Sequence, residues 1–200
     1  MHQKLQKAMK RFTYFRFFFL LSAILLIGGN SAFSQTNYVL SGTPLFKVAG
    51  GSTLHDWEMV SESGVGQGIF VLENGQFKTV QSLTVSFQAE TLKSGTRGLD
   101  SNAYKALKTD KYKEVRFVLK ELTGQGSSMT AKGDLTIAGV TKLVSFPVKV
   151  SAVGNKLTFE GSLETRLTNF SITPPTALMG TVKTEDEIKL SFKSTFQPTL

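Results

Sequence analysis

Residues 129–150 read MTAKGDLTIAGVTKLVSFPVKV, and apolar side chains alternate with polar ones along most of this stretch. From Met129 to Ile137 every second residue is apolar or glycine, and threonine, lysine and aspartate fill the positions between. A period of two is typical of a β-strand with one buried face. The alternation breaks at Ala138-Gly139 and resumes from Val144 to Val150, so the stretch predicts two successive half-buried strands.

The same pattern recurs on both sides of this stretch. The predicted strands cover residues 53–59, 68–72, 83–89, 115–120, 129–137, 144–150, 157–163 and 188–196. A turn at residues 61–64 is expected to join the first two as a pair, and Asn74-Gly75 marks a tight turn after the second. Antiparallel strands with one apolar face form a sandwich or a closed barrel, and closure removes exposed edges. We therefore expect an all-β fold, an eight-stranded antiparallel barrel.

One segment interrupts the β pattern, residues 93–117, KSGTRGLDSNAYKALKTDKYKEVRF. Within it Leu99, Ala103 and Leu107 recur at helical spacing, and Asp100 or Ser101 is placed to cap a helix N-terminus. Four lysines follow toward the C-terminal end, where they complement the helix dipole. These features predict a short helical insert over about 98–108, with an apolar face available to dock on the sheet.

The N-terminal residues resemble an export signal. Five Lys or Arg residues precede an apolar run at residues 17–27, and Ala32-Phe33-Ser34 places small residues where a signal peptidase cuts. We expect a helical signal peptide over residues 1–34, one domain over residues 35–200, and a periplasmic or secreted location after export of the Gram-negative type. The alternative is an uncleaved anchor, for which the apolar run is short against the roughly 20 residues of a bilayer span.

Charge and cysteine content exclude several classes of protein. The chain carries a net charge of +8, and removing the five leader cations leaves +3. The remaining lysines alternate with apolar residues instead of forming a basic stripe with interleaved aromatics, so no nucleic-acid partner is expected. The absence of cysteine excludes disulfides and thiol chemistry. The hydrophobic core alone must therefore hold the exported fold.

A membrane-embedded barrel is the alternative for an exported chain with eight alternating strands. Lipid-facing strands carry apolar outer residues and aromatic girdles around a polar lumen. Here each strand sets one strongly apolar face against lysine, threonine and serine. This pattern favours a barrel with its apolar face inward and no stable membrane insertion after signal cleavage.

The contents of the barrel are left open by the pattern. Phenylalanines fall on the apolar faces of six different strands, at positions 70, 87, 117, 146, 159 and 192. An eight-stranded barrel is wide enough to be filled by side chains or to hold one small ligand. Glycines within strands, at positions 68, 133 and 161, leave room for sharp coiling or for the close approach of a ligand.

The chain resembles the YceI-like domain family, described as polyisoprenoid-binding. The resemblance covers nearly all of residues 35–200, and GDLTIAGVTK at residues 133–142 is its most specific segment. Other matching segments are STLHDW (52–57), GIF (68–70), LTVSF (83–87), LKSGTR (92–97), YKAL (104–107), VRF (115–117), NFSI (169–172) and Pro174-Pro175. In the helical segment the chain departs from the family, because Gly98-Leu99 separates Arg97 from Asp100 and YKAL replaces an aromatic part.

The resemblance implies an exported, lipocalin-like barrel with a helical segment over one end and an apolar tunnel for a long isoprenoid or similar lipid. The residues themselves show no carboxylate pair, nucleophile motif, phosphate loop or metal cluster above chance, so we expect no enzymatic activity and no metal. We expect no cofactor besides such a lipid, and the partners considered are this ligand and a second copy of the chain in a homodimer. We expect the ligand-binding residues to be Trp57, Phe70, Phe87, Arg97, Tyr104, Phe117, Leu119, Leu135, Phe146, Phe159, Phe170 and Phe192.

Two groups of polar residues invite a functional interpretation. His55 is the single histidine after the leader, and without partner ligands or a nucleophile it is better explained as a structural residue near a strand end. Arg97, Asp100 and Tyr104 are placed where the helix would meet the barrel mouth. They could contact a ligand head group, or they could cap the helix and anchor its loop.

Two functions remain open from the sequence. The first is a carrier or storage protein that holds a polyisoprenoid, such as a quinone tail, or a fatty-acyl chain. The second is a secreted, packed β-barrel that acts as an interaction module without a small ligand. The aromatic side chains distinguish them, because they line a channel in the first and meet in the centre in the second.

Overall fold

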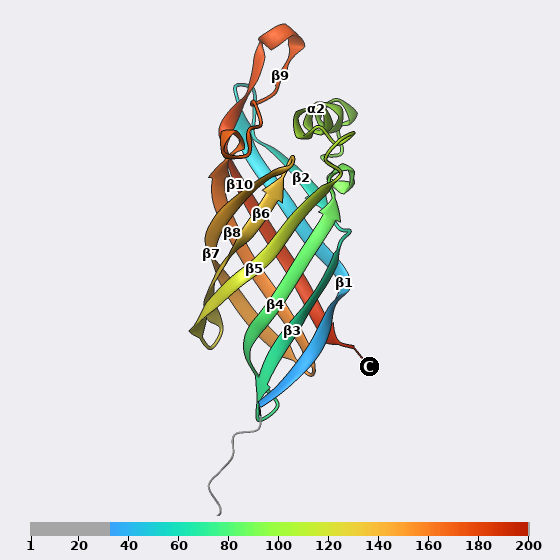
Figure 1. The fold of residues 1–200 in the computed structure, drawn as a ribbon. Coiled ribbons are helices and arrows are strands. Elements are labelled where there is room, and N and C mark those ends of the chain that lie inside the picture. Colours follow the sequence, from blue (N-terminus) through green and yellow to red (C-terminus); the bar gives the residue numbers. More distant parts are fainter. Residues whose placement is uncertain (1–32, 200) are drawn as a thin grey trace, which may run out of the picture. The chain divides into compact units, whose positions relative to one another are not determined.

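The computed structural model describes residues 33–199, and the predicted signal peptide lies outside them except for Phe33 and Ser34. Figure 1 shows strands wound into a barrel, with one α-helix at one end. The strands are β1 (Phe33–Ser52), β2 (Trp57–Ser61), β3 (Val65–Glu73), β4 (Gln76–Gln88), β5 (Glu114–Gln125), β6 (Ser128–Ile137), β7 (Val140–Val153), β8 (Lys156–Arg166), β9 (Thr176–Ala177) and β10 (Val182–Pro198). The helical elements are α2 (Arg97–Leu107) and three 3-10 turns, η1 (Ala89–Thr91), η2 (Leu167–Phe170) and η3 (Leu178–Gly180).

The barrel is closed by its first and last long strands. Neighbouring strands are antiparallel in the order β1-β3-β4-β5-β6-β7-β8-β10, and β10 then pairs with β1 from Tyr38↔Pro198 to Ser52↔Thr184. Eight strands therefore form the closed wall, and β2 and β9 are short additions at one end. This confirms the predicted eight-stranded antiparallel barrel. Closure leaves no long edge exposed to pair with another chain.

The start of the barrel differs from the prediction. The first strand is β1, which the sequence pattern did not reveal, and residues 53–56 form a turn. The predicted pairing of the first two strands is wrong, since β2 and β3 both pair with β1, at Phe46↔Ser61 and Val39↔Gln67, and not with each other. The register of β1 against β10 shifts between Ser41 and Leu45. This irregularity interrupts the alternation by which strands are recognised.

Aromatic side chains fill the end of the barrel opposite α2. Phe70 stacks on Tyr38, with ring centroids 4.4 Å apart. The ring centroids of Phe159 and Phe196 each lie 5.6 Å from that of Phe70. Phe70 and Phe196 are at most 1% exposed. We call Tyr38, Phe70, Phe77, Phe159 and Phe196 the aromatic plug, and it fills the end of the barrel opposite α2.

Two strand glycines make room for protein side chains. A methyl group at Gly133 would collide with the ring of Phe117 on the neighbouring strand, and one at Gly161 would lie 2.8 Å from the ring of Phe192, its cross-strand partner. Each glycine therefore admits a phenylalanine ring from an adjacent strand. The close approach that these two glycines allow is used by phenylalanine rings of the protein.

The outer face of the barrel is polar. Cross-strand ion pairs join Lys193 to Glu160 at 2.7 Å and Lys120 to Asp134 at 3.0 Å. These residues alternate with inward apolar neighbours, which confirms the predicted orientation of the two faces. Within residues 33–199, no helix has the length and apolar character needed to cross a bilayer.

A candidate apolar binding cavity

A cavity of about 1130 Å³ occupies the barrel between the aromatic plug and α2. Most of its wall consists of inward side chains from the barrel strands, and α2, η2 and the β9–β10 hairpin surround its mouth. The wall is mainly apolar, because it is built from the positions that the period-two pattern directs inward. The cavity is larger than the roughly 300–1,000 Å³ typical of small-molecule pockets.

Nine of the twelve predicted ligand-binding residues lie in the cavity wall. They are Trp57, Phe87, Phe117, Leu119, Leu135, Phe146, Phe159, Phe170 and Phe192. Three of these form a connected aromatic row, in which Phe146 lies 5.5 Å from Phe117 and 5.7 Å from Phe192, centroid to centroid. The aromatic residues therefore line a space in the α2 half of the barrel and meet in the centre only at the plug.

Phe70, Arg97 and Tyr104 lie outside the cavity wall. Phe70 belongs to the plug, where Tyr38 and Phe196 cover it completely. Arg97 is exposed at the first position of α2 and joins none of the ion pairs of the described residues. The sequence pattern placed Phe70 on the inward face of its strand, and it placed Arg97 and Tyr104 in the helical segment. It did not predict how far along the barrel axis Phe70 lies or which side of the helix the other two occupy.

Tyr104 anchors α2 to the chain that precedes it. Its hydroxyl lies 2.9 Å from the carbonyl oxygen of Glu90 and 2.7 Å from that of Leu92, so one proton serves two acceptors. The same oxygen accepts a hydrogen bond from Lys93 Nζ at 2.6 Å. These contacts hold the helix over η1 and leave the Tyr104 hydroxyl no free role in the cavity.

Asp100 fixes the loop before the helix. Its Oδ1 accepts hydrogen bonds from the backbone N–H of Ser94 at 2.8 Å and from the Ser94 hydroxyl at 2.7 Å. The Ser94 side-chain hydrogen bond is the main reason that the pKa of Asp100 lies below its ordinary value. The sequence left two roles open for Asp100 and Tyr104, contact with a ligand head group or anchoring of the helix and its loop. Their hydrogen bonds fit the anchoring role.

The apolar face of α2 borders the cavity. Leu99, Ala103, Ala106 and Leu107 all line the cavity mouth, and no residue of α2 is fully buried. The predicted helix is confirmed, but its apolar side covers an opening instead of packing flat on a sheet. At its far end Lys108 takes a left-handed conformation with φ of 54°, which ends the helix.

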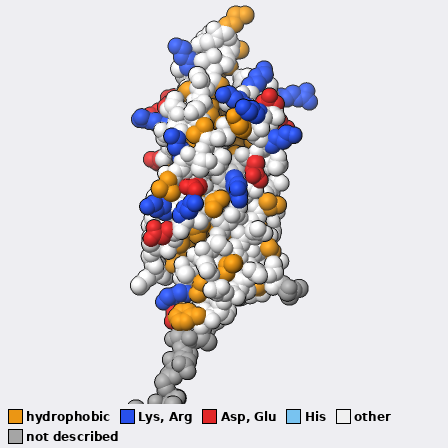
Figure 2. Space-filling view, in the orientation of Figure 1, with side chains coloured by type: hydrophobic (Ala, Val, Ile, Leu, Met, Phe, Trp, Pro, Cys, Tyr) orange, Lys and Arg blue, Asp and Glu red, His pale blue; other side chains and the backbone are white. Residues whose placement is uncertain are grey.

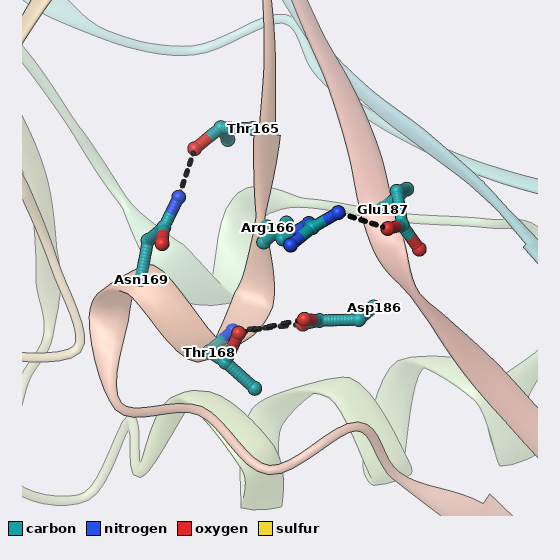
Figure 3. A network of polar contacts seen from close by, with 6 residues as sticks. All are labelled: Thr165, Arg166, Thr168, Asn169, Asp186 and Glu187. Atoms are coloured by element: carbon teal, nitrogen blue, oxygen red, sulfur yellow. Dashed lines mark hydrogen bonds and ion pairs between the residues drawn. The ribbon is translucent and has the colours of Figure 1, made fainter.

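A polar network holds η2 against β10, as Figure 3 shows. Asp186 accepts hydrogen bonds from the Thr168 N–H at 2.9 Å and the Thr168 hydroxyl at 2.6 Å. These bonds lower the pKa of Asp186. Beside them Arg166 pairs with Glu187 at 3.0 Å. The network positions η2, which supplies buried Phe170 to the cavity wall.

The sequence analysis missed several wall residues. Phe46 and Met59 line the cavity from β1 and β2, and Phe46 stacks on Phe87 at 4.8 Å. The hairpin of β9 and β10, with the η3 turn between them, borders the mouth with residues 175–180 and 182. Pro174-Pro175 was the one available signal of an unusual connection there. The hairpin itself shows no alternation that would reveal it.

His55 and Trp57 lie at the rim of the cavity. His55 Nδ1 is 2.6 Å from the carbonyl oxygen of Asp56, and Trp57 Nε1 donates to the Gly51 carbonyl at 2.9 Å. Within residues 33–199, no three His, Cys, Asp or Glu side chains are grouped closely enough to hold a metal ion. The cavity wall therefore offers mainly apolar contact, and the ring nitrogens of these two rim residues lie within hydrogen-bond distance of loop carbonyls.

One buried hydroxyl in the wall has no partner. Ser194 is 3% exposed, and its Oγ is the buried side-chain polar atom of the described residues that makes no hydrogen bond. It occupies an inward position of β10 between Phe192 and Phe196. The small Ser194 side chain leaves space in the cavity at this position, whereas Phe192 and Phe196 on either side of it fill the space with aromatic rings.

Solved structures share this architecture. BcnA of Burkholderia cenocepacia is 18% identical, with a TM-score of 0.64 over 76% of this chain and 95% of that protein. The YceI protein of Campylobacter jejuni is also 18% identical, with a TM-score of 0.51 over 60% of this chain and 74% of that protein. At this level of identity the likeness shows a common fold. No curated protein matches the chain.

The sequence also matches a family model. The model described as the YceI-like domain covers residues 50–196, from the last three residues of β1 to two residues before the end of β10. This range includes the cavity wall from Ser52 onward, α2 and the β9–β10 hairpin. The chain with this barrel and this apolar cavity therefore belongs to the YceI-like domain family.

Proposed function

We propose that this protein is an exported, non-enzymatic binding protein that holds a long apolar ligand in its barrel. A polyisoprenoid, such as a quinone tail, or a fatty-acyl chain has the required chemistry. The ligand would be held for transport, storage or a stress response. The observation that carries the proposal is the mainly apolar cavity of about 1130 Å³ with a mouth at one end.

The physical argument rests on what can occupy such a space. Water needs two to four polar partners to be stable in a cavity. Along the inner wall, side chains such as Leu135, Phe146 and Leu163 offer none. An apolar chain entering the cavity gains roughly 0.8 kcal/mol for each buried CH₂ group. The cavity is therefore better suited to a hydrocarbon chain than to water.

The shape supports an elongated ligand with one end near the mouth. The plug closes the far end, so a guest enters between α2 and the β9–β10 hairpin. Polar groups lie at the rim, where Thr96, Ser101 and Asn102 of the helical segment face the opening. A polar head group would find hydrogen-bonding partners there while its tail fills the barrel.

The first experiment is native mass spectrometry of the protein purified from the periplasm of a Gram-negative host, followed by organic extraction and lipid analysis. A stoichiometric polyprenyl or acyl species is expected. A bare protein that also fails to take up long-chain quinones or fatty acids in vitro would reject the proposal. It would leave the interaction module as the better explanation.

A cavity-filling variant tests where the ligand lies. Leu163→Trp places a large ring in the cavity from β8, and Glu164→Trp places the same ring on the outer face one residue later. We expect Leu163→Trp to lose most of the bound lipid and Glu164→Trp to keep it. Equal lipid content in the two variants would show that the ligand binds elsewhere.

A further inference from the structure

We propose that the cavity mouth docks on an anionic lipid bilayer, with the tip of the β9–β10 hairpin inserted and α2 lying at the lipid head groups. The inference concerns a surface and stands apart from the identity of any ligand in the barrel. Three observations carry it: apolar side chains at the tip, a concentration of positive charge in residues 93–113, which include α2, and the position of both at the open end of the cavity.

The hairpin tip exposes large apolar side chains to solvent. Leu178 is 72% exposed and Met179 is fully exposed, and both have positive φ values, 49° and 56°. Left-handed backbone is uncommon for such residues. The tip thus holds two apolar side chains away from the protein, where they gain no burial in the isolated molecule.

The hairpin is braced and not loose. Val182 and Lys183 pair with Ala177 and Thr176, and Lys183 also exchanges hydrogen bonds with Thr53, through its N–H at 3.0 Å and its carbonyl at 2.9 Å. The turn that contains Thr53 presents Leu54, which is 65% exposed. Leu54, Leu178 and Met179 are thus three exposed apolar side chains on connected segments at one end of the barrel.

Positive charge gathers on the other side of the mouth. Residues 93–113 contain six Lys or Arg and two Asp, a net charge of +4, although residues 35–200 together carry only +3. None of the six cations joins an ion pair among the described residues. Figure 2 shows Lys and Arg side chains gathered at the α2 end, below the apolar tip of the projecting hairpin.

Negative charges at the same end are distributed unevenly around the mouth. Glu185, Asp186 and Glu187 lie on β10, on the side where the hairpin leaves the barrel, whereas beside the cationic segment Glu90 accepts a hydrogen bond from Thr109. A surface of negative lipids would repel the three acidic residues of β10 and attract α2, so the docked barrel is inclined toward the helix. An anionic membrane attracts Lys and Arg side chains close to its surface, so the six cations of residues 93–113 supply the main electrostatic attraction.

The apolar hairpin tip and the basic segment at residues 93–113 together provide the two attractions needed for reversible binding at a membrane surface, namely apolar insertion and charge. A few inserted apolar side chains or a basic patch alone binds a membrane weakly, and the two together bind stably. Leu178, Met179 and Leu99 border the same opening, so docking there brings the cavity mouth against the bilayer. An apolar chain could then pass between bilayer and barrel without crossing water.

The test is vesicle co-sedimentation of the exported, purified protein with an equimolar mixture of phosphatidylglycerol and phosphatidylcholine, and with phosphatidylcholine alone. We expect binding to the mixture that weakens as salt is raised, and little binding to phosphatidylcholine. Leu178→Asp with Met179→Asp should lower the affinity at least about tenfold, because the inserted area is lost. Arg97→Glu with Lys105→Glu should also lower it at least about tenfold, through charge.

A matched control is available at the opposite end of the barrel. Val153→Asp with Lys156→Glu makes the same kinds of change in the β7–β8 turn, where Val153 is 81% exposed. This variant should bind vesicles as the unchanged protein does. Equal binding by the tip variant and the control, or no binding of the unchanged protein to anionic vesicles, would overturn the proposal.

Depth of insertion has its own readout, because the chain contains no cysteine. A polarity-sensitive fluorophore on Met179→Cys should shift its emission to the blue on anionic vesicles, and the same label on Val153→Cys should not. A Met179 label that stays in water while the protein binds would favour a different docking face and reject this one. Native mass spectrometry of the unchanged protein separates this result from the proposed function. Bound lipid without vesicle binding would reject the docking face alone, and vesicle binding without bound lipid would reject the carrier function alone.

Discussion

At the residue scale, a few small inward residues determine which parts of the barrel interior are filled by side chains and which remain as cavity. Gly133 and Gly161 admit the rings of Phe117 and Phe192, which lets these rings lie along the wall. Ser194 occupies an inward position of β10 where Phe192 and Phe196 stand on either side. Its unpartnered hydroxyl carries a desolvation cost without a compensating hydrogen bond.

Ser194→Ala is expected to stabilise the protein. Removing the unpartnered hydroxyl should raise the free energy of unfolding by about 1 kcal/mol, since a buried unsatisfied group costs roughly 1–3 kcal/mol. Chemical denaturation measures the change. Ser61→Ala is the control, because Ser61 is equally buried but its hydroxyl bonds to Thr91 at 2.6 Å and to the Ser63 carbonyl. Loss of stability in both variants would show that Ser194 has a partner in solution.

At the scale of elements, α2 is held mainly by polar anchors, because its apolar face borders the cavity mouth and is not fully buried. Tyr104 and Asp100 tie it to the preceding segment, and Thr109 donates to Glu90 at 2.7 Å just beyond its end. A helix held in this way depends on a few hydrogen bonds. Those bonds should therefore govern how often it opens.

Tyr104→Phe should loosen the helix. The change removes the hydroxyl that serves the Glu90 and Leu92 carbonyls, and a typical net hydrogen bond of about 1 kcal/mol corresponds to a roughly fivefold faster opening. Hydrogen exchange of the α2 amides measures this. Lys105→Ala, at an exposed position on the same helix, should leave exchange nearly unchanged. Unaltered exchange in Tyr104→Phe would mean that apolar contacts alone hold the helix.

The η2 network should contribute a pH-dependent part of the stability. The pKa of Asp186 is lowered in the folded protein from an ordinary value of 3.8, chiefly by the hydrogen bonds from Thr168. A lowered folded-state pKa adds stability that is fully present above 3.8 and is lost as the pH falls through the folded value. Asp186→Asn should therefore show a smaller loss of stability between neutral and strongly acidic pH.

Acid titrations followed by circular dichroism, on the unchanged protein and on Asp186→Asn, test this dependence. Glu164→Gln serves as control, because Glu164 makes none of the ion pairs or side-chain hydrogen bonds of the described residues. Its acid profile should match that of the unchanged protein. Superimposable profiles for all three proteins would show that the network does not stabilise the fold through charge.

At the scale of the whole molecule, β1 completes the barrel. It pairs with β10 from Tyr38 to Ser52, and it also pairs with β2 and β3. It also brings Tyr38 to the plug, stacked on Phe70 at 4.4 Å. The family match begins only at residue 50, so most of this strand precedes the part of the chain that the family model covers.

A chain that begins at Gly50 should therefore fail to fold. Without β1 the edges of β10 and β3 are exposed and the barrel is open, which favours aggregation. A chain that begins at Gln35 should fold, because it loses only Phe33 and Ser34 at the end of the ladder with β3. Circular dichroism and size-exclusion chromatography compare the two. A monomeric, cooperatively folding chain from Gly50 would show that the barrel can close without β1.

The sequence by itself determined the faces of the strands and the nature of the fold. Alternation from Met129 to Val150 was enough to assign inward and outward positions, and the helical spacing of Leu99, Ala103 and Leu107 located α2. These are local properties, because each depends on a side chain and its near neighbours along the chain. They were confirmed for that reason, whereas β1 escaped notice because the irregular stretch between Ser41 and Leu45 breaks the pattern.

Only the tertiary structure decided what lies inside. Phe70 and Phe146 have the same sequence signature, yet one is sealed in the plug and the other lines the cavity. Their difference arises from position along the barrel axis, which depends on the stagger of strands such as β1 and β10, paired at Tyr38↔Pro198. Whether inward side chains meet or leave space is set by contacts between distant parts of the chain, and a local pattern carries no information about them.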